Sequence, residues 1–368
     1  MFGFKALQSI FSPQEDPLCR TLRASAVPVS TADCRACADP CDLGHEAYPR
    51  RFDVDMDTNM LGTVKPYHRQ IVISTGKSDW EREITDDGNS LAAALHEVTT
   101  SDSQTTSTPP TPAPTPTGTP KPASPLPGKG VRPAVTGLFQ TSDSKRTSVL
   151  NGSHKTLSCE DDHESVLVFP DFQVVTEVRR SVQGAHELWE SAVDPEIGRD
   201  GSYLEKSILK TWILPYSCVI LLCSHRKRDN RCGIAAPKLE HAFIKSLESH
   251  GWDADTQLEH PSLTMGPPLE DLNVTSEEKQ QNISAQLKQS SEAKRALIVK
   301  VSHVGGHKYA GNCILYTPSG SGIWYGRVTP HDVDSIVTNT IINGLILPPL
   351  LRGGLNLSRP NCQTLNDW

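Results

Sequence analysis

Apolar and polar positions follow the most regular pattern in the C-terminal half of the chain. The run at 215–225 is short and rich in Val, Ile and Leu, which is typical of a buried strand. Apolar residues then recur at helical spacing over 234–251, where a glycine ends the pattern. A strand at 296–302, a hairpin around the turn SGSG and a helix over 329–344 follow. The order β-α-β-β-β-α predicts an α/β domain of thioredoxin-like type.

A smaller α/β domain is predicted in the N-terminal half. Residues 69–74 form one strand-like run and residues 165–175 form another. Between them, residues 101–130 hold nine prolines and one large apolar residue, so this stretch cannot build a core. Because polar residues continue beyond it, we predict a disordered Pro/Ser/Thr-rich insertion over 101–163.

The chain is therefore expected to divide into five parts. They are a mostly irregular Cys-containing segment at 1–44, an N-terminal α/β domain at 45–100 and 164–200, the insertion at 101–163, a thioredoxin-like domain at 205–352 with a polar insertion at 261–293, and a tail at 353–368.

Composition and charge exclude several classes of protein. The net charge is −7, whereas a general nucleic-acid binder would carry a basic face. No apolar run approaches the roughly 18–20 residues of a membrane span, so we expect no membrane partner. The start MFGFKALQSIF lacks the pattern of a secretory signal, and we expect a soluble, intracellular protein.

Two motifs follow apolar strands in the C-terminal domain. Cys223 and Cys232 are separated by eight residues, and His303 and His307 are separated by three, two of which are glycines. The carboxyl ends of neighbouring parallel strands meet at one edge of a sheet, so these side chains can converge. Two thiolates and two imidazoles form a four-ligand set that suits zinc or a [2Fe–2S] cluster.

The ligand types do not decide between these two groups. Structural zinc sites usually bring two cysteines together in a tight C-x2–4-C turn, and the spacing here is looser. A structural Cys2His2 zinc module in an interaction protein therefore stays an alternative. A thiol oxidoreductase of thioredoxin-like fold is a further alternative, although the chain lacks the C-x-x-C pattern at these cysteines. A solitary buried cysteine without any metal is the ordinary structural interpretation.

The motifs resemble the fungal sucrase/ferredoxin-like family. The resemblance is carried by CSHRKRDNRCG, HVGGHKYAGN and WYGRVTP, with CRACADPC, GTVKPYHRQIVISTGKSDW and FPDF in the N-terminal half. It covers about 45–100 and 164–352. It implies a thioredoxin-like ferredoxin domain that binds one [2Fe–2S] cluster, with the two cysteines on one iron and the two histidines on the other. The implied ligands are Cys223, Cys232, His303 and His307.

The implied function is electron transfer by a carrier, with proton uptake at a ligand histidine coupled to reduction. The chain shows no paired-carboxylate signature for glycoside hydrolysis, and an enzymatic activity is not assigned. The redox donor and acceptor are not identified. Six residues beside the motifs either contact a redox partner or hydrogen-bond the ligand loops: Arg228, Asp229, Arg231, Lys308, Tyr309 and Asn312.

A second group of cysteines lies near the N-terminus. Cys34, Cys37 and Cys41 precede His45, a pattern that fits zinc or another metal. The segment is short and polar and contains a proline, so a redox-sensitive or incidental cluster is the other interpretation.

Both ends of the chain bear on localisation. Residues 1–24 are a poor match to a mitochondrial presequence, because acidic residues accompany the few basic ones. The tail residues Leu365, Asp367 and Trp368 resemble the ending by which cytosolic iron–sulfur proteins engage the cytosolic assembly and targeting machinery. We therefore expect the protein in the cytoplasm, with the mitochondrion as the alternative.

Overall fold

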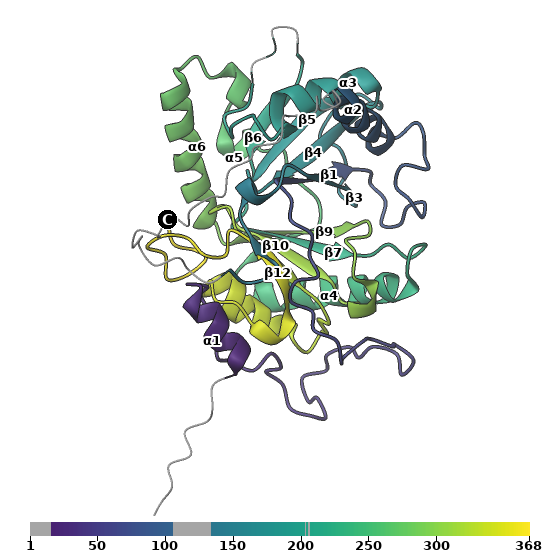
Figure 1. Cartoon of the computed structure of the whole chain (residues 1–368), viewed down its shortest axis with the longest axis vertical. Helices are drawn as coiled ribbons and strands as arrows, with labels where there is room; N and C mark the ends of the chain where they lie inside the picture. The colour runs from purple at the N-terminus through teal and green to yellow at the C-terminus, as the bar shows by residue number, and fades with distance from the viewer. Residues whose placement is uncertain (1–15, 106–133, 203, 205–206) are drawn as a thin grey trace, which may run out of the picture.

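A computed structural model describes residues 16–105, 134–202, 204 and 207–368. Strands of both halves of the described chain join one mixed sheet, in the order β2-β12-β11-β10-β7-β9-β3-β1-β4-β5-β6, with β8 beside β9 (Figure 1). The α/β prediction is confirmed. The strands are β1 (Arg69–Ser74), β2 (Leu138–Phe139), β3 (Thr147–Gly152), β4 (His163–Phe169), β5 (Gln173–Arg179), β6 (Lys210–Ile213), β7 (Cys218–Cys223), β8 (Asp253–Asp255), β9 (Arg295–Val301), β10 (Cys313–Tyr316), β11 (Gly322–Tyr325) and β12 (Leu351–Leu355).

Most of the helices cover the outer faces of this sheet, and two pack against the core between its inner faces. The α-helices are α1 (Pro17–Ala24), α2 (Leu91–Thr105), α3 (Val182–Leu188), α4 (Asn230–Ser249), α5 (Ser262–Met265), α6 (Ser276–Ser291) and α7 (Val333–Ser335), and α7 continues as a π-helix over Ile336–Ile342. Among the helices of the described residues, none combines the length and the apolar character that a membrane crossing needs.

The two halves of the molecule repeat one topology. In the C-terminal half, β7 pairs parallel with β9 and antiparallel with β10, which pairs with β11. In the N-terminal half, β1 pairs in the same way with β3 and β4, and β4 pairs with β5. Helices α4 and α2 make the corresponding crossovers, and α7 and α3 follow the last strands. Both halves therefore have the β-α-β-β-β-α order that the sequence predicts for the C-terminal half alone.

The halves meet edge to edge through β3 and β9. The N–H of Ser302 donates to the carbonyl of Asn151 at 2.9 Å, and the N–H of Ser153 donates to the carbonyl of Lys300 at 2.8 Å. The strong twist of the sheet then turns the inner faces of the halves toward each other, as Figure 1 shows. The rings of Phe169 and Tyr316, one from each half, stack with centroids 4.2 Å apart. The halves therefore share a core.

The prediction of a disordered insertion is wrong for its last part. Residues 134–163 contribute β2 and β3, and β3 pairs with β1 along its whole length. The strand has the sequence TSVLNG, whose polar ends hide its two apolar residues from a pattern search. Residues 106–133 of that predicted insertion lie outside the described residues.

The polar insertion predicted at 261–293 is also part of the packed structure. The helix expected at 276–290 is present as α6, and its N-cap Thr275 forms a capping box with Glu278. Two turns of α6 bury Ile283 and Leu287 against the shared core. Because only these two positions of the helix are large, apolar and buried, the sequence around them looks fully solvated.

Candidate metal and redox site

Cys223 and Cys232 lie at the junction of β7 and α4. Cys223 is the last residue of β7, and Cys232 lies in the first turn of α4, not in a loop as the sequence pattern indicated. The helix starts early because Asp229 caps it, with its carboxylate accepting from the N–H of Arg231 at 2.9 Å. The cap turns the chain sharply after the strand and returns Cys232 to the side of Cys223.

The two thiols are buried, and each changes the pKa of the other. The neighbouring Cys232 side chain holds the pKa of Cys223 well below its ordinary value, with a further contribution from His303. The same neighbour effect, together with burial, raises the pKa of Cys232 well above the ordinary value. A buried pair of this kind carries one negative charge readily, and a second charge needs a cation between the sulfurs.

His303 and His307 lie on the loop after β9, on the side of the two sulfurs. Their ring centroids are 5.6 Å apart, and His303 is the ring beside Cys223. Nδ1 of His303 is buried and has no hydrogen-bond partner among the described residues, although such atoms normally have one. His307 is exposed. The structure therefore brings the two predicted motifs together, with buried sulfurs and one imidazole at the surface.

A buried arginine from β12 holds the histidine loop in place. The side chain of Arg352 is 1% exposed, and its Nη1 donates to the carbonyl of Gly305 at 3.2 Å and to Oδ1 of Asn312 at 2.6 Å. A Cβ at Gly306 would lie 2.2 Å from the guanidinium, and the φ of this residue is +64°, so the position requires glycine. Burial lowers the pKa of Arg352 to about 10, and the nearby Cys223 sulfur opposes that shift. The sequence analysis did not identify Arg352, which follows the histidine motif by more than forty positions.

His225 supports the loop from the opposite side. Its Nδ1 accepts from the N–H of His303 at 3.2 Å, and its Nε2 lies 3.0 Å from the carbonyl of Trp80. An acceptor at Nδ1 and a donor at Nε2 together define the neutral ring with its proton on Nε2. His225 is 1% exposed, so these two contacts orient it rigidly.

The segment after β1 wraps the cysteine loop. Ser224 Oγ donates to the carbonyl of Ser78 at 2.7 Å, and the N–H of Lys227 donates to Asp79 at 3.1 Å. Lys227 also pairs with Glu81 at 2.5 Å. The STGKSDW string of the N-terminal half is therefore part of the second layer around the two thiols.

The residues expected beside the motifs mostly make contacts within the chain. Arg228 pairs with Glu83, and Arg231 donates to the Asp229 carboxylate, which lowers the pKa of Asp229. Three further residues lie after the second histidine. Lys308 pairs with Asp55 at 3.1 Å, the buried Tyr309 donates to the carbonyl of Asn59, and Asn312 Nδ2 donates to the carbonyl of Gly306.

A cavity of about 450 Å³ opens beside the histidine loop. His303, Val304 and Trp324 line one side of it, and Lys65 and Arg146 contribute positive charge. The cavity therefore borders the imidazole of His303, and neither Cys223 nor Cys232 lines it.

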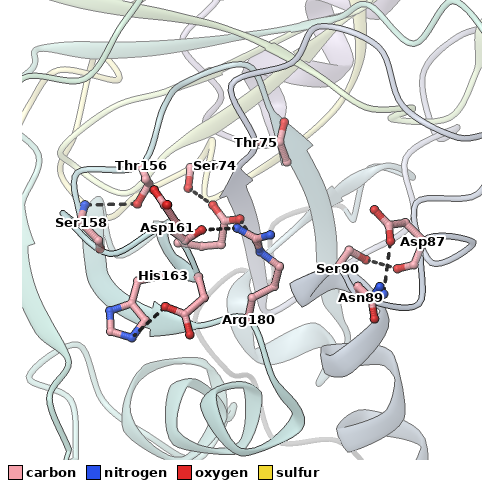
Figure 2. A network of polar contacts seen from close by, with 12 residues as sticks. Ser74, Thr75, Asp87, Asn89, Ser90, Thr156, Ser158, Asp161, His163 and Arg180 are labelled. Atoms are coloured by element: carbon pink, nitrogen blue, oxygen red, sulfur yellow. Dashed lines mark hydrogen bonds and ion pairs between the residues drawn. The ribbon is translucent and has the colours of Figure 1, made fainter.

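The N-terminal half has a different set of side chains at the equivalent edge. Ser74 ends β1 opposite Gly152, as Cys223 ends β7 opposite Val301. Figure 2 shows the polar network around Ser74, which donates to Glu164 at 2.6 Å, while Arg180 donates to the same carboxylate at 3.1 Å. Hydroxyl, carboxylate and guanidinium groups in this position form an internal hydrogen-bond network.

The N-terminal cysteines are divided by the fold. Cys34 packs against the core, and burial raises its pKa to about 12. Cys37, Cys41 and His45 instead gather with His331, and one ligand atom from each of the four lies within 4.8 Å of the others. The described chain therefore contains a Cys2His2 group that can hold a metal ion. His331 was not part of the sequence prediction.

The C-terminal residues are packed more tightly than a free tail would be. Leu365 is buried in the core, and Asp367 accepts from the N–H groups of Gln363 and Thr364 at 2.6 and 2.8 Å. Trp368 is 51% exposed. The assignment of these residues to the cytosolic assembly machinery stays a prediction.

Comparisons with known proteins agree with the resemblance seen in the sequence. The family model described as sucrase/ferredoxin-like matches residues 60–353. The actin patches distal protein 1 of Saccharomyces cerevisiae is 24% identical over 89% of this chain and 85% of its own length. The altered inheritance of mitochondria protein 32 is 36% identical in Debaryomyces hansenii and 31% identical in Meyerozyma guilliermondii. Each of these two matches covers 37–38% of this chain and 35% of the relative, so the chain spans about a third of their length. No solved structure matches the chain significantly.

Proposed function

This chain belongs to the sucrase/ferredoxin-like family, and we propose that it is an electron carrier that binds one [2Fe–2S] cluster through Cys223, Cys232, His303 and His307. The observation that carries the proposal is the pairing of two adjacent buried thiols, of which Cys223 ionises first, with a buried imidazole nitrogen, Nδ1 of His303, that lacks a partner among the described residues. Such donors fit a cationic group of iron and sulfide. When bound, that group supplies a one-electron redox centre.

The spacing of the donors bears on whether the site holds one metal centre or two. Four ligands of a single zinc ion lie within about 4 Å of one another, because the metal–ligand bonds are about 2.0–2.3 Å long. Among the described residues, the Cys223 set does not meet even a 4.8 Å limit, whereas the Cys37 set does. A wider donor set is compatible with a two-iron cluster at Cys223, and a zinc module there stays the alternative.

The cysteines, the exposed histidine and Arg352 would each have a different role in such a site. Cys223 and Cys232 bind on the buried side, where β7, α4 and the segment after β1 exclude water. The ring of His307 is exposed, so this side of the site is in contact with water. Arg352 keeps a fixed positive charge close to the thiolates, which favours added negative charge. We infer that reduction is coupled to proton uptake and that the potential falls as the pH rises.

Metal analysis separates the proposal from its alternatives. A structural zinc module would contain zinc at Cys223 and no iron. A thiol oxidoreductase would instead show a Cys223–Cys232 dithiol that cycles with a disulfide and needs no metal. Iron with acid-labile sulfide, lost together in a Cys223→Ser variant, is the outcome expected here.

The location in the cell is part of the same proposal. We propose a cytoplasmic carrier, with the mitochondrion as the alternative that the name of the altered inheritance of mitochondria relatives raises. Fractionation of cells that express the full chain would show which compartment holds the iron-loaded protein.

A further inference from the structure

We propose that Cys37, Cys41, His45 and His331 form a second metal site, which binds one zinc ion and fastens the N-terminal segment to the C-terminal half. Cys37 and His331 are 294 positions apart in the sequence, yet Sγ of Cys37 lies 3.3 Å from Nδ1 of His331. Sγ of Cys41 lies 3.4 Å from Nδ1 of His45. The two cysteine–histidine pairs adjoin each other, with the histidine rings edge to face at 5.5 Å.

The distances fit a single ion. Zinc–sulfur and zinc–nitrogen bonds of about 2.3 and 2.0–2.1 Å give sulfur–nitrogen separations of about 3.6 Å in a tetrahedral site. The two separations here are 3.3 and 3.4 Å, and the four ligand atoms all lie within 4.8 Å of one another. A small rearrangement, in which these two separations widen slightly and the longer ones shorten, would complete the tetrahedron. The ligands of a two-iron cluster need more room, because they are divided between two metal centres.

The chemistry of the ligands favours zinc. Two thiolates and two imidazoles form one of the usual structural zinc sets, and hard cations such as Mg²⁺ and Ca²⁺ prefer oxygen. Asp332, which directly follows His331 in the sequence, is occupied as an acceptor for the N–H and hydroxyl of Thr329. With four protein ligands the coordination is complete, so the site is structural and leaves no position for a substrate.

The local backbone is arranged around Cys41. The N–H groups of His45, Leu43 and Gly44 face its sulfur. Gly44 has a φ of +70° and no atom near its missing side chain, and this left-handed turn brings His45 back toward Cys41. N–H groups directed at a cysteine sulfur stabilise a thiolate ligand.

A metal ion at this position would anchor the N-terminal segment to the C-terminal half. Residues 31–52 contain no helix or strand, and they lie on the C-terminal half through three partly buried side chains, Cys34, Tyr48 and Phe52, and a few polar contacts. Ser335 Oγ donates to the carbonyl of Asp33 at 2.8 Å, and Tyr48 donates from its hydroxyl to the carbonyl of Val328 at 2.7 Å. A metal ion that joins Cys37 to His331 would stabilise the whole arrangement.

The test is the metal content of the full chain, purified anaerobically with thiols reduced, and of three variants. We expect about one zinc ion per chain in the wild type and near zero in His331→Ala. Cys159→Ser, which changes an exposed cysteine outside the group, should keep the zinc. Iron should be unchanged in His331→Ala, whereas Cys223→Ser should lose iron and keep zinc, so failure of this site and failure of the cluster can be told apart.

A second measurement covers the case in which His331→Ala does not fold. The wild-type chain, stripped of zinc by a mild chelator and loaded with Co²⁺, should show the intense visible absorption of a tetrahedral cobalt–thiolate site. Zinc-free wild type that also fails to develop this absorption would overturn the proposal. Equal zinc content in His331→Ala and wild type would also overturn the proposal. So would a Cys37–Cys41 disulfide that persists in the chain purified under reducing conditions.

Discussion

Nη1 of Arg352, on β12, donates a hydrogen bond of 2.6 Å to Oδ1 of Asn312, whose side-chain amide in turn donates to the carbonyl of Gly306 in the histidine loop. The two side chains are almost completely buried. They connect β12, which lies next to the edge strand β2, to the loop that carries His303 and His307. The loop geometry therefore depends on a residue outside both the cysteine and the histidine motif.

Replacing Arg352 should damage the site without touching a ligand. Arg352→Met leaves Asn312 and the carbonyl of Gly305 without a donor, and we expect a loss of roughly 2–4 kcal/mol in the free energy of unfolding. It also removes a cation near the thiolates, so the potential of the iron site should become more negative. Denaturant titration and potentiometry measure the two effects.

Arg352→Lys is the matched control because it keeps the charge and loses the planar fork of donors. Its potential should stay close to that of the wild type while its stability falls. An unchanged potential in both variants would contradict the electrostatic role of Arg352.

His225 should control how well the site holds iron. In His225→Phe the N–H of His303 and the carbonyl of Trp80 both lose their partner, which costs roughly 1–3 kcal/mol for each group left buried and unpaired. We expect lower iron occupancy after anaerobic purification. His225→Asn, with one acceptor and one donor, should recover part of it. Full occupancy in His225→Phe would show that the loop does not need this support.

Exchanging a proposed histidine ligand for cysteine should change both the potential and its pH dependence. A thiolate adds negative charge where imidazole is neutral, so His307→Cys should lower the potential by roughly 100 mV or more. The thiolate has no second proton to exchange, so the slope of potential against pH should flatten. Protein-film voltammetry at several pH values measures both quantities. The same slope in His307→Cys and wild type would exclude proton exchange at His307.

His154 makes stability depend on acid. Its ring is completely buried two residues after β3, and burial lowers its pKa from 6.5 to about 4. The unfolded chain therefore takes up this proton at a higher pH than the folded chain does. Stability should fall as the pH drops from about 6.5 to about 4, by up to roughly 3 kcal/mol from this group.

The test compares denaturant titrations of His154→Gln and wild type over that pH range. The variant should show a flatter dependence of unfolding free energy on pH, whatever its stability at neutral pH. His96→Gln, which changes an exposed histidine, should keep the wild-type slope. An unaltered slope in His154→Gln would assign the acid sensitivity to other groups.

The sequence predicted the elements whose burial follows a clear period. Strands β7 and β9 are continuous apolar runs, and the hairpin β10–β11 has a glycine turn between two apolar segments. Strand β3 was not predicted because half of its residues are polar. It lies inside the sheet because β1 and β9 pair with it on either side, and a search of its own sequence cannot show this. The repeat of the fold in the N-terminal half was missed for the same reason.

The site was predictable only in the parts that are close together in sequence. The spacing of the cysteine and histidine motifs indicated the four proposed ligands, Cys223, Cys232, His303 and His307. The start of α4 could have been recognised from Asp229, whose capping role is a local signal. Three other residues could not have been recognised from the sequence, because each contacts a partner that only the folded chain brings near. They are Arg352, His225 and His331. Contacts between residues far apart in the chain produce no periodic pattern of apolar and polar positions in a single sequence.

Metal and sulfide analysis of the anaerobically purified full chain tests the central claim most directly. We predict about two iron atoms and two acid-labile sulfides per chain, both lost in Cys223→Ser, beside the zinc proposed at Cys37. A protein that contains only zinc, with neither iron nor sulfide, and whose zinc falls in Cys223→Ser, would contradict the assignment of an iron–sulfur electron carrier.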